Sequence, residues 1–281
     1  MQDETIRIFD GAVAIITGGA SGIGAALGRE LTKRGCEVIL GDRQIELAEE
    51  VAAAIRHAGG KATAAELNAV DYDAVEALVY ETVNRTGRLD YMFNNAGIAM
   101  TGPAIVYKIE DWNAVIDVNL WGVIHGVQAA YKVMLEQGFG HIVNTASLAG
   151  LLTAPGRLSY ATTKHAIVGL SKTLRIEAAM QGIRVSVFCP GFVRTPIIDR
   201  CGKYGKVLKE PSPEQQEKLN QLVEKCKPIP PDIFAQKALD AVARNEAIIV
   251  IPSRNKLFWW FDRLFPEWNL WLTQKKLAEY I

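Results

Sequence analysis

The sequence predicts an α/β protein with a doubly wound, Rossmann-type parallel sheet of about seven strands and helices on both faces. Three observations lead to this prediction. Short β-branched apolar runs alternate with longer segments of helical periodicity along the 281 residues. A glycine-rich turn follows the first apolar run, and an acidic residue ends the second. Apolar residues make up 49% of the chain, which is enough for a sizeable core.

The predicted elements follow one another in strand–helix order. The expected strands are residues 13–17, 37–41, 61–67, 89–93, 140–145, 185–188 and 247–251. The expected helices are one that stops near Gly35 and residues 44–57, 71–85, 112–137, 159–181, 213–225 and 232–244. This alternation indicates one domain over residues 1–281, with a substrate lid at about 195–231 and an aromatic tail at about 254–281.

The first strand leads straight into TGGASGIG, residues 17–24. Gly18 lets the chain turn tightly, while Gly22 and Gly24 let the backbone approach a pyrophosphate and let the helix pack on the sheet. The helix N-terminus offers N–H groups and a positive dipole end to the phosphates, and Ser21 can donate one more hydrogen bond. Strand, glycine turn, helix, strand and acid together predict a dinucleotide site.

Asp42, at the end of the second strand, indicates which dinucleotide binds. Its carboxylate can accept hydrogen bonds from both ribose hydroxyls of NAD and would repel the 2′-phosphate of NADP. Arg43 complicates this prediction, because it can stack on adenine or turn toward a 2′-phosphate. We therefore expect NAD as the cofactor, with NADP as the alternative.

Ser147, Tyr160 and Lys164 can together move a proton to or from an alcohol oxygen. Tyr160 and Lys164 lie four residues apart in a predicted helix, so they share a face. A free tyrosine has a pKa of ~10, and a nearby ammonium lowers that pKa by stabilising the phenolate. Ser147 would supply a second hydroxyl to hold the substrate oxygen.

These motifs resemble those of the classical short-chain dehydrogenases/reductases, densely over residues 9–195 and loosely beyond. The matching segments are TGGASGIG, NNAG (residues 94–97), DVNLWG around Asn119, the Ser147 and Tyr160-x-x-x-Lys164 set, and PGFVRT (residues 190–195). The resemblance implies a catalytic set of Asn119, Ser147, Tyr160 and Lys164. It implies a cofactor site formed by Gly18, Ser21, Gly22, Ile23, Gly24, Asp42, Arg43, Asn68, Ala69, Asn95, Gly97, Tyr160, Lys164, Pro190, Val193 and Thr195. Asn68 stands where the family often has an aspartate, and its amide can still hydrogen-bond adenine.

Composition and motifs argue against several other classes of function. Lys plus Arg and Asp plus Glu number 31 each, so the formal net charge of zero gives no case for nucleic acid. The four histidines, His57, His125, His141 and His165, are scattered, and the four cysteines show no metal-ligand spacing, so we expect no metal. Free cysteines, with no leader-like or membrane-spanning stretch, indicate a cytoplasmic protein.

Two segments bear on substrate and partners. Met100, Leu151, Leu152, Phe192, Ile197 and Ile198 are expected to form an apolar wall near the reacting carbon. The aromatic tail concentrates Trp259, Trp260, Phe261, Phe265, Trp268 and Trp271. We expect the tail to be buried against a partner subunit of a homo-oligomer. A membrane-surface contact helped by Lys275 and Lys276 is a second interpretation, and coverage of the protein's own cleft is a third.

The sequence thus predicts an NAD(H)-dependent oxidoreductase that interconverts a secondary alcohol and a ketone, with a lipophilic small molecule as substrate. Tyr160 would exchange the hydroxyl proton, while Asn119 would support the proton relay. The alternatives are an NADP(H)-dependent ketone or 3-oxoacyl reductase, an epimerase or dehydratase, and a dinucleotide-sensing regulator or scaffold.

Overall fold

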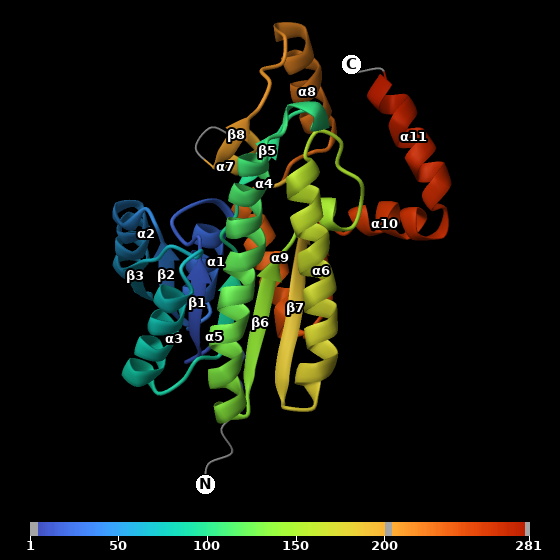
Figure 1. The fold of residues 1–281 in the computed structure, drawn as a ribbon. Helices are drawn as coiled ribbons and strands as arrows, with labels where there is room; N and C mark the ends of the chain where they lie inside the picture. Colours follow the sequence, from blue (N-terminus) through green and yellow to red (C-terminus); the bar gives the residue numbers. More distant parts are fainter. Residues whose placement is uncertain (1–4, 200–203, 279–281) are drawn as a thin grey trace.

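The computed structural model describes residues 5–199 and 204–278, and its centre is a seven-stranded parallel sheet (Figure 1). The strand order is β3-β2-β1-β4-β6-β7-β9, which confirms the predicted doubly wound fold. The strands are β1 (Val13–Thr17), β2 (Glu37–Asp42), β3 (Lys61–Glu66), β4 (Tyr91–Asn94), β6 (Gly140–Thr145), β7 (Ile183–Pro190) and β9 (Ile248–Ile251). Every residue of β1 is buried, as its apolar run predicts for a central parallel strand.

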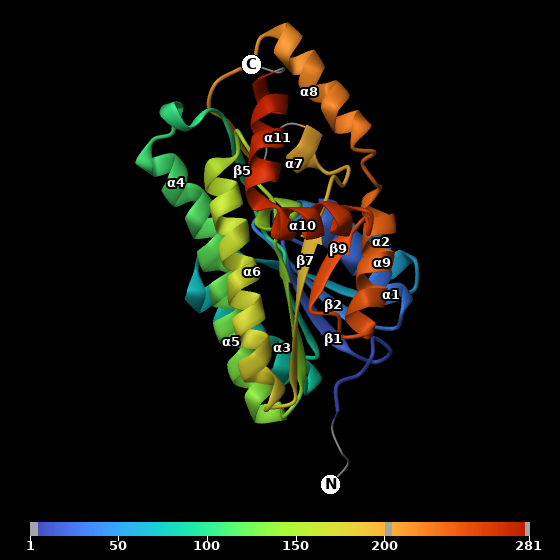
Figure 2. The ribbon, with the colours of Figure 1, turned by 90° about the vertical axis from the view of Figure 1, so that its right-hand side faces the viewer.

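Helices cover both faces of this sheet (Figure 2). On one face lie α1 (Gly22–Lys33), α2 (Ile45–His57) and α9 (Pro231–Ala243), which bury Leu27, Ile55 and Phe234 in one core. On the other lie α3 (Tyr72–Thr86), α5 (Gly122–Gln137) and α6 (Leu158–Ala179), which bury Val79, Val133 and Ile167 in a second core. Since both faces are covered, the loops at the carboxyl ends of the strands are where a ligand can enter.

The predicted helix at 112–137 differs from the structure in one functional detail. It begins earlier, as α4 (Ile109–Ile116), and passes through a π-helical turn at Asp117–Trp121 before α5. A π-helical turn adds one residue to the helical repeat and often marks a functional site. Here the turn contains Asn119, whose side chain is fully buried.

The predicted lid contains more regular structure than its sequence suggested. It comprises α7 (Pro196–Asp199), β8 (Gly205–Val207) and α8 (Pro213–Lys225). β8 pairs in parallel with β5 (Ala99–Thr101), which was not predicted either. α8 begins at Ser212, whose hydroxyl accepts a hydrogen bond from the backbone N–H of Gln215 in a capping box. These elements lie beyond the carboxyl ends of the strands (Figures 1 and 2).

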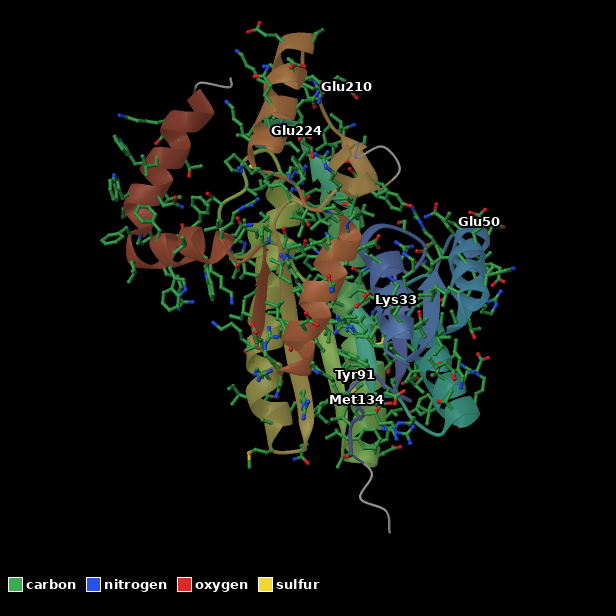
Figure 3. All side chains as sticks on the ribbon, turned by 180° about the vertical axis from the view of Figure 1, so that it is seen from behind. Lys33, Glu50, Tyr91, Met134, Glu210 and Glu224 are labelled. Carbon is green, nitrogen blue, oxygen red and sulfur yellow. The ribbon has the colours of Figure 1, made fainter. Side chains whose placement is uncertain are left out.

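The aromatic tail forms two helices, α10 (Asn255–Leu264) and α11 (Pro266–Ala278), which were not predicted. α10 contacts the rest of the protein along one edge, where Trp259 packs on the second core, and α11 extends away from it (Figure 1). Figure 3 shows many side chains of these two helices projecting outward. The rest of the chain therefore does not bury most of the tail, although burial was expected. No helix among the described residues is both long enough and apolar enough to cross a membrane.

Candidate active site

A cavity of about 570 Å³ opens at the carboxyl ends of β1, β2, β4, β6 and β7. The sequence-predicted site residues that line it are Gly18, Ser21, Gly22, Ile23, Asp42, Arg43, Asn68, Ala69, Asn95, Gly97, Ser147, Tyr160, Lys164, Pro190, Val193 and Thr195. Gly24 and Asn119 are absent from this lining and lie behind the wall. Residues almost 180 positions apart in sequence thus meet around one space.

The glycines of the turn allow close contacts between backbone segments that a side chain would prevent. Gly18 has a φ of +68°, and a Cβ there would lie 2.9 Å from Cα of Ala96. A Cβ on Gly24 would collide with the carbonyl oxygen of Gly18, so this glycine lets α1 pack against the turn. The first turn of α1 meets the cavity through Ser21, Gly22 and Ile23, where helix N–H groups lack intrahelical acceptors. This cradle fits the pyrophosphate of a dinucleotide.

Thr17 and Asn95 join the glycine turn to the loop after β4. The hydroxyl of Thr17 accepts hydrogen bonds from the backbone N–H of Asn95 (3.0 Å) and of Ala96 (3.1 Å). The side-chain amide of Asn95 donates in return to the carbonyl of Thr17 (3.2 Å). These bonds fix two strand ends relative to each other, which is a structural role that the sequence motif alone did not reveal.

Asp42 is held rigidly at the end of β2. Oδ2 accepts a hydrogen bond from the backbone N–H of Ala20 (3.0 Å), and Oδ1 accepts one from that of Gln44 (3.0 Å). The side chain is buried while still lining the cavity, whereas the neighbouring Arg43 is exposed. The carboxylate is thus positioned before any ligand arrives, and Arg43 is not.

Lys164 is the buried cation of the site. Only 3% of its surface is exposed, and Nζ donates to the carbonyl of Thr145 at 2.8 Å. Nζ lies 5.4 Å from the ring centroid of Tyr160, which is also buried. Burial lowers the pKa of Lys164 to about 8, and the nearby Cys189 opposes this shift slightly. Burial of the charged ammonium beside the tyrosine ring therefore costs folding free energy.

Asn119 reaches the back of the same wall. Its Oδ1 accepts from the backbone N–H of Ile98 (2.8 Å), and its Nδ2 donates to the carbonyl of Ile98 (2.9 Å) and to the hydroxyl of Thr163 (3.3 Å). A Cβ on Gly97 would lie 3.3 Å from Oδ1 of Asn119 and 3.6 Å from Nζ of Lys164, so these three residues meet at one point.

Ser147 lies on the cavity side of the same wall. It caps the short 3₁₀ turn Leu148–Gly150, where its Oγ accepts from the backbone N–H of Ala149 at 3.1 Å. This bond leaves the hydroxyl proton of Ser147 available to a ligand in the cavity.

The apolar wall of the cavity differs from the predicted one. Leu152, Phe192 and Ile197 line it, while Met100 and Leu151 are buried elsewhere in the core, and the side chain of Ile198 lies outside the described residues. Lid residues that were not predicted also line it, namely Leu219, Leu222, Val223 and Cys226 of α8 and its C-terminus. Thr145 was missed as well, although it ends a predicted strand next to Ser147. Among the described residues no group of His, Cys, Asp and Glu is arranged to hold a metal.

Lys164 predicts a measurable dependence of stability on pH. Its folded pKa of about 8 is below the ordinary lysine pKa of 10.5. Between these values the unfolded chain binds a proton that the folded chain has lost, so the free energy of unfolding rises with pH; below about pH 8 the full cost of burying the ammonium applies. Without cofactor, the free energy of unfolding of the wild type minus that of Lys164→Met should rise by about 2–3 kcal/mol from about pH 7 to about pH 10. Urea unfolding at several pH values measures this difference; a flat difference would show that burial does not lower the pKa.

Known proteins match both the sequence and this geometry. A family model described as short chain dehydrogenase matches residues 12–203. The 3-oxoacyl-(acyl-carrier-protein) reductase of Thermotoga maritima is 38% identical over 68% of this chain and 78% of its own length. The cyclohexanol dehydrogenase of an Acinetobacter strain is 38% identical over 68% and 76%. The crystal structure of a short-chain dehydrogenase/reductase from Burkholderia phymatum in complex with NAD superposes with a TM-score of 0.83 at 30% identity, covering 93% of this chain and 96% of that one. The chain therefore belongs to the short-chain dehydrogenase family, the NAD(P)-dependent oxidoreductases that act on alcohol and keto groups, as its motifs predicted.

Proposed function

We propose that this protein transfers a hydride between NAD(H) and a lipophilic secondary alcohol or ketone. The observation that carries the proposal is the convergence of Ser147, Tyr160 and Lys164 on the cavity that also receives the glycine turn and Asp42. A hydroxyl donor, a phenol and a buried cation beside a dinucleotide cradle are the groups that alcohol oxidation requires.

Each residue has a defined part in the proposed chemistry. The glycine turn and Asp42 would hold the dinucleotide, whose nicotinamide would supply the hydride acceptor for oxidation and the hydride donor for reduction. The phenolate of Tyr160 takes up the hydroxyl proton of the alcohol, and the phenol donates that proton to the ketone oxygen in the reverse direction. Ser147 holds the substrate oxygen by donating its hydroxyl proton. The ammonium of Lys164 favours the phenolate of Tyr160 and binds the nicotinamide ribose. Asn119 supports the relay by fixing the backbone next to Lys164.

NAD(H) is the preferred cofactor in this proposal. The buried carboxylate of Asp42 is oriented by two backbone donors and would repel a 2′-phosphate at the end of β2. Arg43 follows Asp42 directly and also lines the cavity, and no hydrogen bond to another described residue fixes its exposed side chain. The binding of NAD by the similar Burkholderia phymatum protein supports the same choice.

An apolar substrate fits the walls of the cleft. Leu152, Phe192 and Ile197 line the cavity together with Leu219 and Leu222 of α8. The similar cyclohexanol dehydrogenase supports an apolar alcohol, while the similar 3-oxoacyl reductase supports the alternative of an NADP(H)-dependent 3-oxoacyl reductase. A sensor or scaffold is the other alternative, and the complete proton-transfer set argues against it.

The cytoplasm is the proposed compartment, because the described cysteines Cys36, Cys189 and Cys226 are all free thiols. The homo-oligomer expected from the sequence stays a prediction.

Replacing Tyr160 by Phe tests the proposed chemistry. The change keeps the ring and removes the transferable proton, so turnover should fall by roughly 10²- to 10⁴-fold while the Kd for NADH stays within a few-fold. Absorbance at 340 nm with a panel of alcohols and ketones measures turnover. Tyr107→Phe is the matched control, because Tyr107 is half-buried and hydrogen-bonded to the carbonyl of Met100 but does not line the cavity. Near-normal turnover in Tyr160→Phe would refute the acid–base role.

The cofactor preference can be measured separately by titration. NADH should bind roughly ten- to hundred-fold more tightly than NADPH, because one uncompensated like-charge contact costs about 1–3 kcal/mol. Asp42→Ala should remove most of this preference by improving NADPH binding. Tighter NADPH than NADH binding in the wild type would show that Arg43 dominates over Asp42.

A further inference from the structure

The aromatic tail is an ordered pair of helices with its own internal packing. The ring of Phe261 in α10 lies 5.3 Å from that of Trp268 in α11, and Phe265 at the bend lies 5.6 Å from Phe261. The side-chain amide of Asn269 donates to Asp262 at 2.6 Å across the bend. The two helices are thus held at a fixed angle before they meet any partner.

The edge of α10 that faces the protein carries Asn255, Lys256 and Trp259, whereas its opposite edge is apolar and faces solvent. Asn255 lies against Gly191, and Lys256 pairs with Glu246 at 3.8 Å. Trp259 packs on the second core. The opposite edge exposes 74% of Leu257, 62% of Phe258, 58% of Trp260 and 65% of Leu264. A helix on the surface of a soluble monomer has the reverse orientation, so this edge is built to meet an apolar phase.

The exposed surface continues over the bend onto α11. Phe265, Trp268, Leu270 and Trp271 are each about half exposed. Eight large exposed apolar side chains thus lie on α10, on α11 and at the bend between them. α11 extends away from the rest of the protein (Figure 1). Single exposed apolar residues need no explanation, whereas a group of this size does.

Cations beside the aromatic rings indicate what covers this surface. The ammonium of Lys275 lies 4.0 Å from the ring centroid of Trp271, and the guanidinium of Arg263 lies 5.9 Å from that of Trp259. None of the ion pairs between described residues includes either cation. Aromatic residues and arginine are enriched in protein interfaces, whereas lysine is depleted in their core, so the contact of Lys275 with Trp271 argues against a protein partner. Tryptophan, phenylalanine and leucine next to both lysine and arginine are typical of helices that lie at the boundary between lipid headgroups and acyl chains.

The root of the tail is tied to the cavity mouth. Nη2 of Arg254, just before α10, donates to the carbonyls of Cys226 (2.7 Å) and Lys227 (2.9 Å) at the C-terminal end of α8. Cys226 and three apolar residues of α8 line the cavity. The tail and α8 lie at the same end of the molecule (Figure 2). A bilayer that held the tail would therefore lie beside the entrance for substrate.

We propose that α10 and α11 bind the surface of an anionic lipid bilayer. Leu257, Phe258, Trp260 and Leu264 enter the acyl boundary, and Arg263 and Lys275 meet anionic headgroups. A corollary, which rests on the proposed function, is that the enzyme takes alcohols or ketones dissolved in that bilayer.

Vesicle flotation with the full chain tests this binding without any turnover. Wild type should float with vesicles of phosphatidylcholine and phosphatidylglycerol, and Trp260→Ser/Leu264→Ser should lower the partition coefficient by roughly tenfold or more. Ile176→Ser/Met180→Ser is the matched control, because these α6 side chains are 75% and 89% exposed outside the tail. The control should bind like wild type. Arg263→Gln/Lys275→Gln should weaken binding several-fold on these vesicles and little on phosphatidylcholine alone.

Light scattering in the absence of lipid tests whether a second copy of this chain, rather than a bilayer, covers this surface. The proposal is overturned if wild type ignores both kinds of vesicle, or if the tail variant binds as well as the control. It is also overturned if the tail variant changes an oligomer into a smaller species while wild type fails to float, because the surface would then join two copies of this chain. Turnover of the panel of apolar alcohols and ketones is measured in parallel; its absence from wild type would count against the proposed function and leave the binding result intact.

Discussion

The parallel pairing of β1, β4, β6 and β7 is the constraint on which the candidate site depends. Each pair runs in the same direction with a fixed register, so the strands present their carboxyl ends at one edge. The residues that follow those ends, Gly18, Asn95, Ser147 and Pro190, therefore meet around one cavity. The backbone positions them, and local hydrogen bonds such as those of Thr17 only refine the positions. The site is a consequence of the sheet, which the two cores on its faces stabilise.

Stability is given up where the proposed chemistry needs it. Burial lowers the pKa of Lys164 to about 8. The folded protein is therefore less stable with this buried ammonium than it would be with a well-packed apolar side chain at the same position. The carbonyl of Thr145 compensates part of that cost and also fixes the direction of the side chain. His141 shows the other outcome of burial. It lies fully buried beside Ser186, its pKa is lowered to about 3, and it stays neutral within the core. Burial thus lowers the pKa of both groups, which leaves the histidine neutral and brings the pKa of the lysine close to neutral pH.

Periodicity predicted the seven-stranded sheet and most helices, because strands of β-branched residues and amphipathic helices differ in repeat. The ends of predicted strands also located Gly18, Asp42 and Ser147, since loops at those ends must meet. The π-helical turn at Asn119 was not predictable, because one added residue hardly changes an apolar helical pattern. The pairing of β5 with β8 joins three-residue strands about a hundred positions apart, which carry no local signal. The sequence showed an aromatic tail, but which edge of α10 faces the protein depends on contacts such as that of Arg254 with the end of α8. Of the three interpretations, coverage of the cleft is wrong for the described residues, because none of the tail lines the cavity.

Transfer of deuterium from NADH labelled at the nicotinamide C4 position tests the central claim most directly. The purified protein is incubated with each stereoisomer of the labelled NADH and a panel of apolar ketones, and the products are analysed by mass spectrometry. The account predicts that one stereoisomer delivers deuterium to the carbinol carbon of at least one alcohol product, and that Tyr160→Phe suppresses this transfer. Tight NADH binding with no deuterium transfer to any ketone would contradict it and favour a dinucleotide-binding role without catalysis.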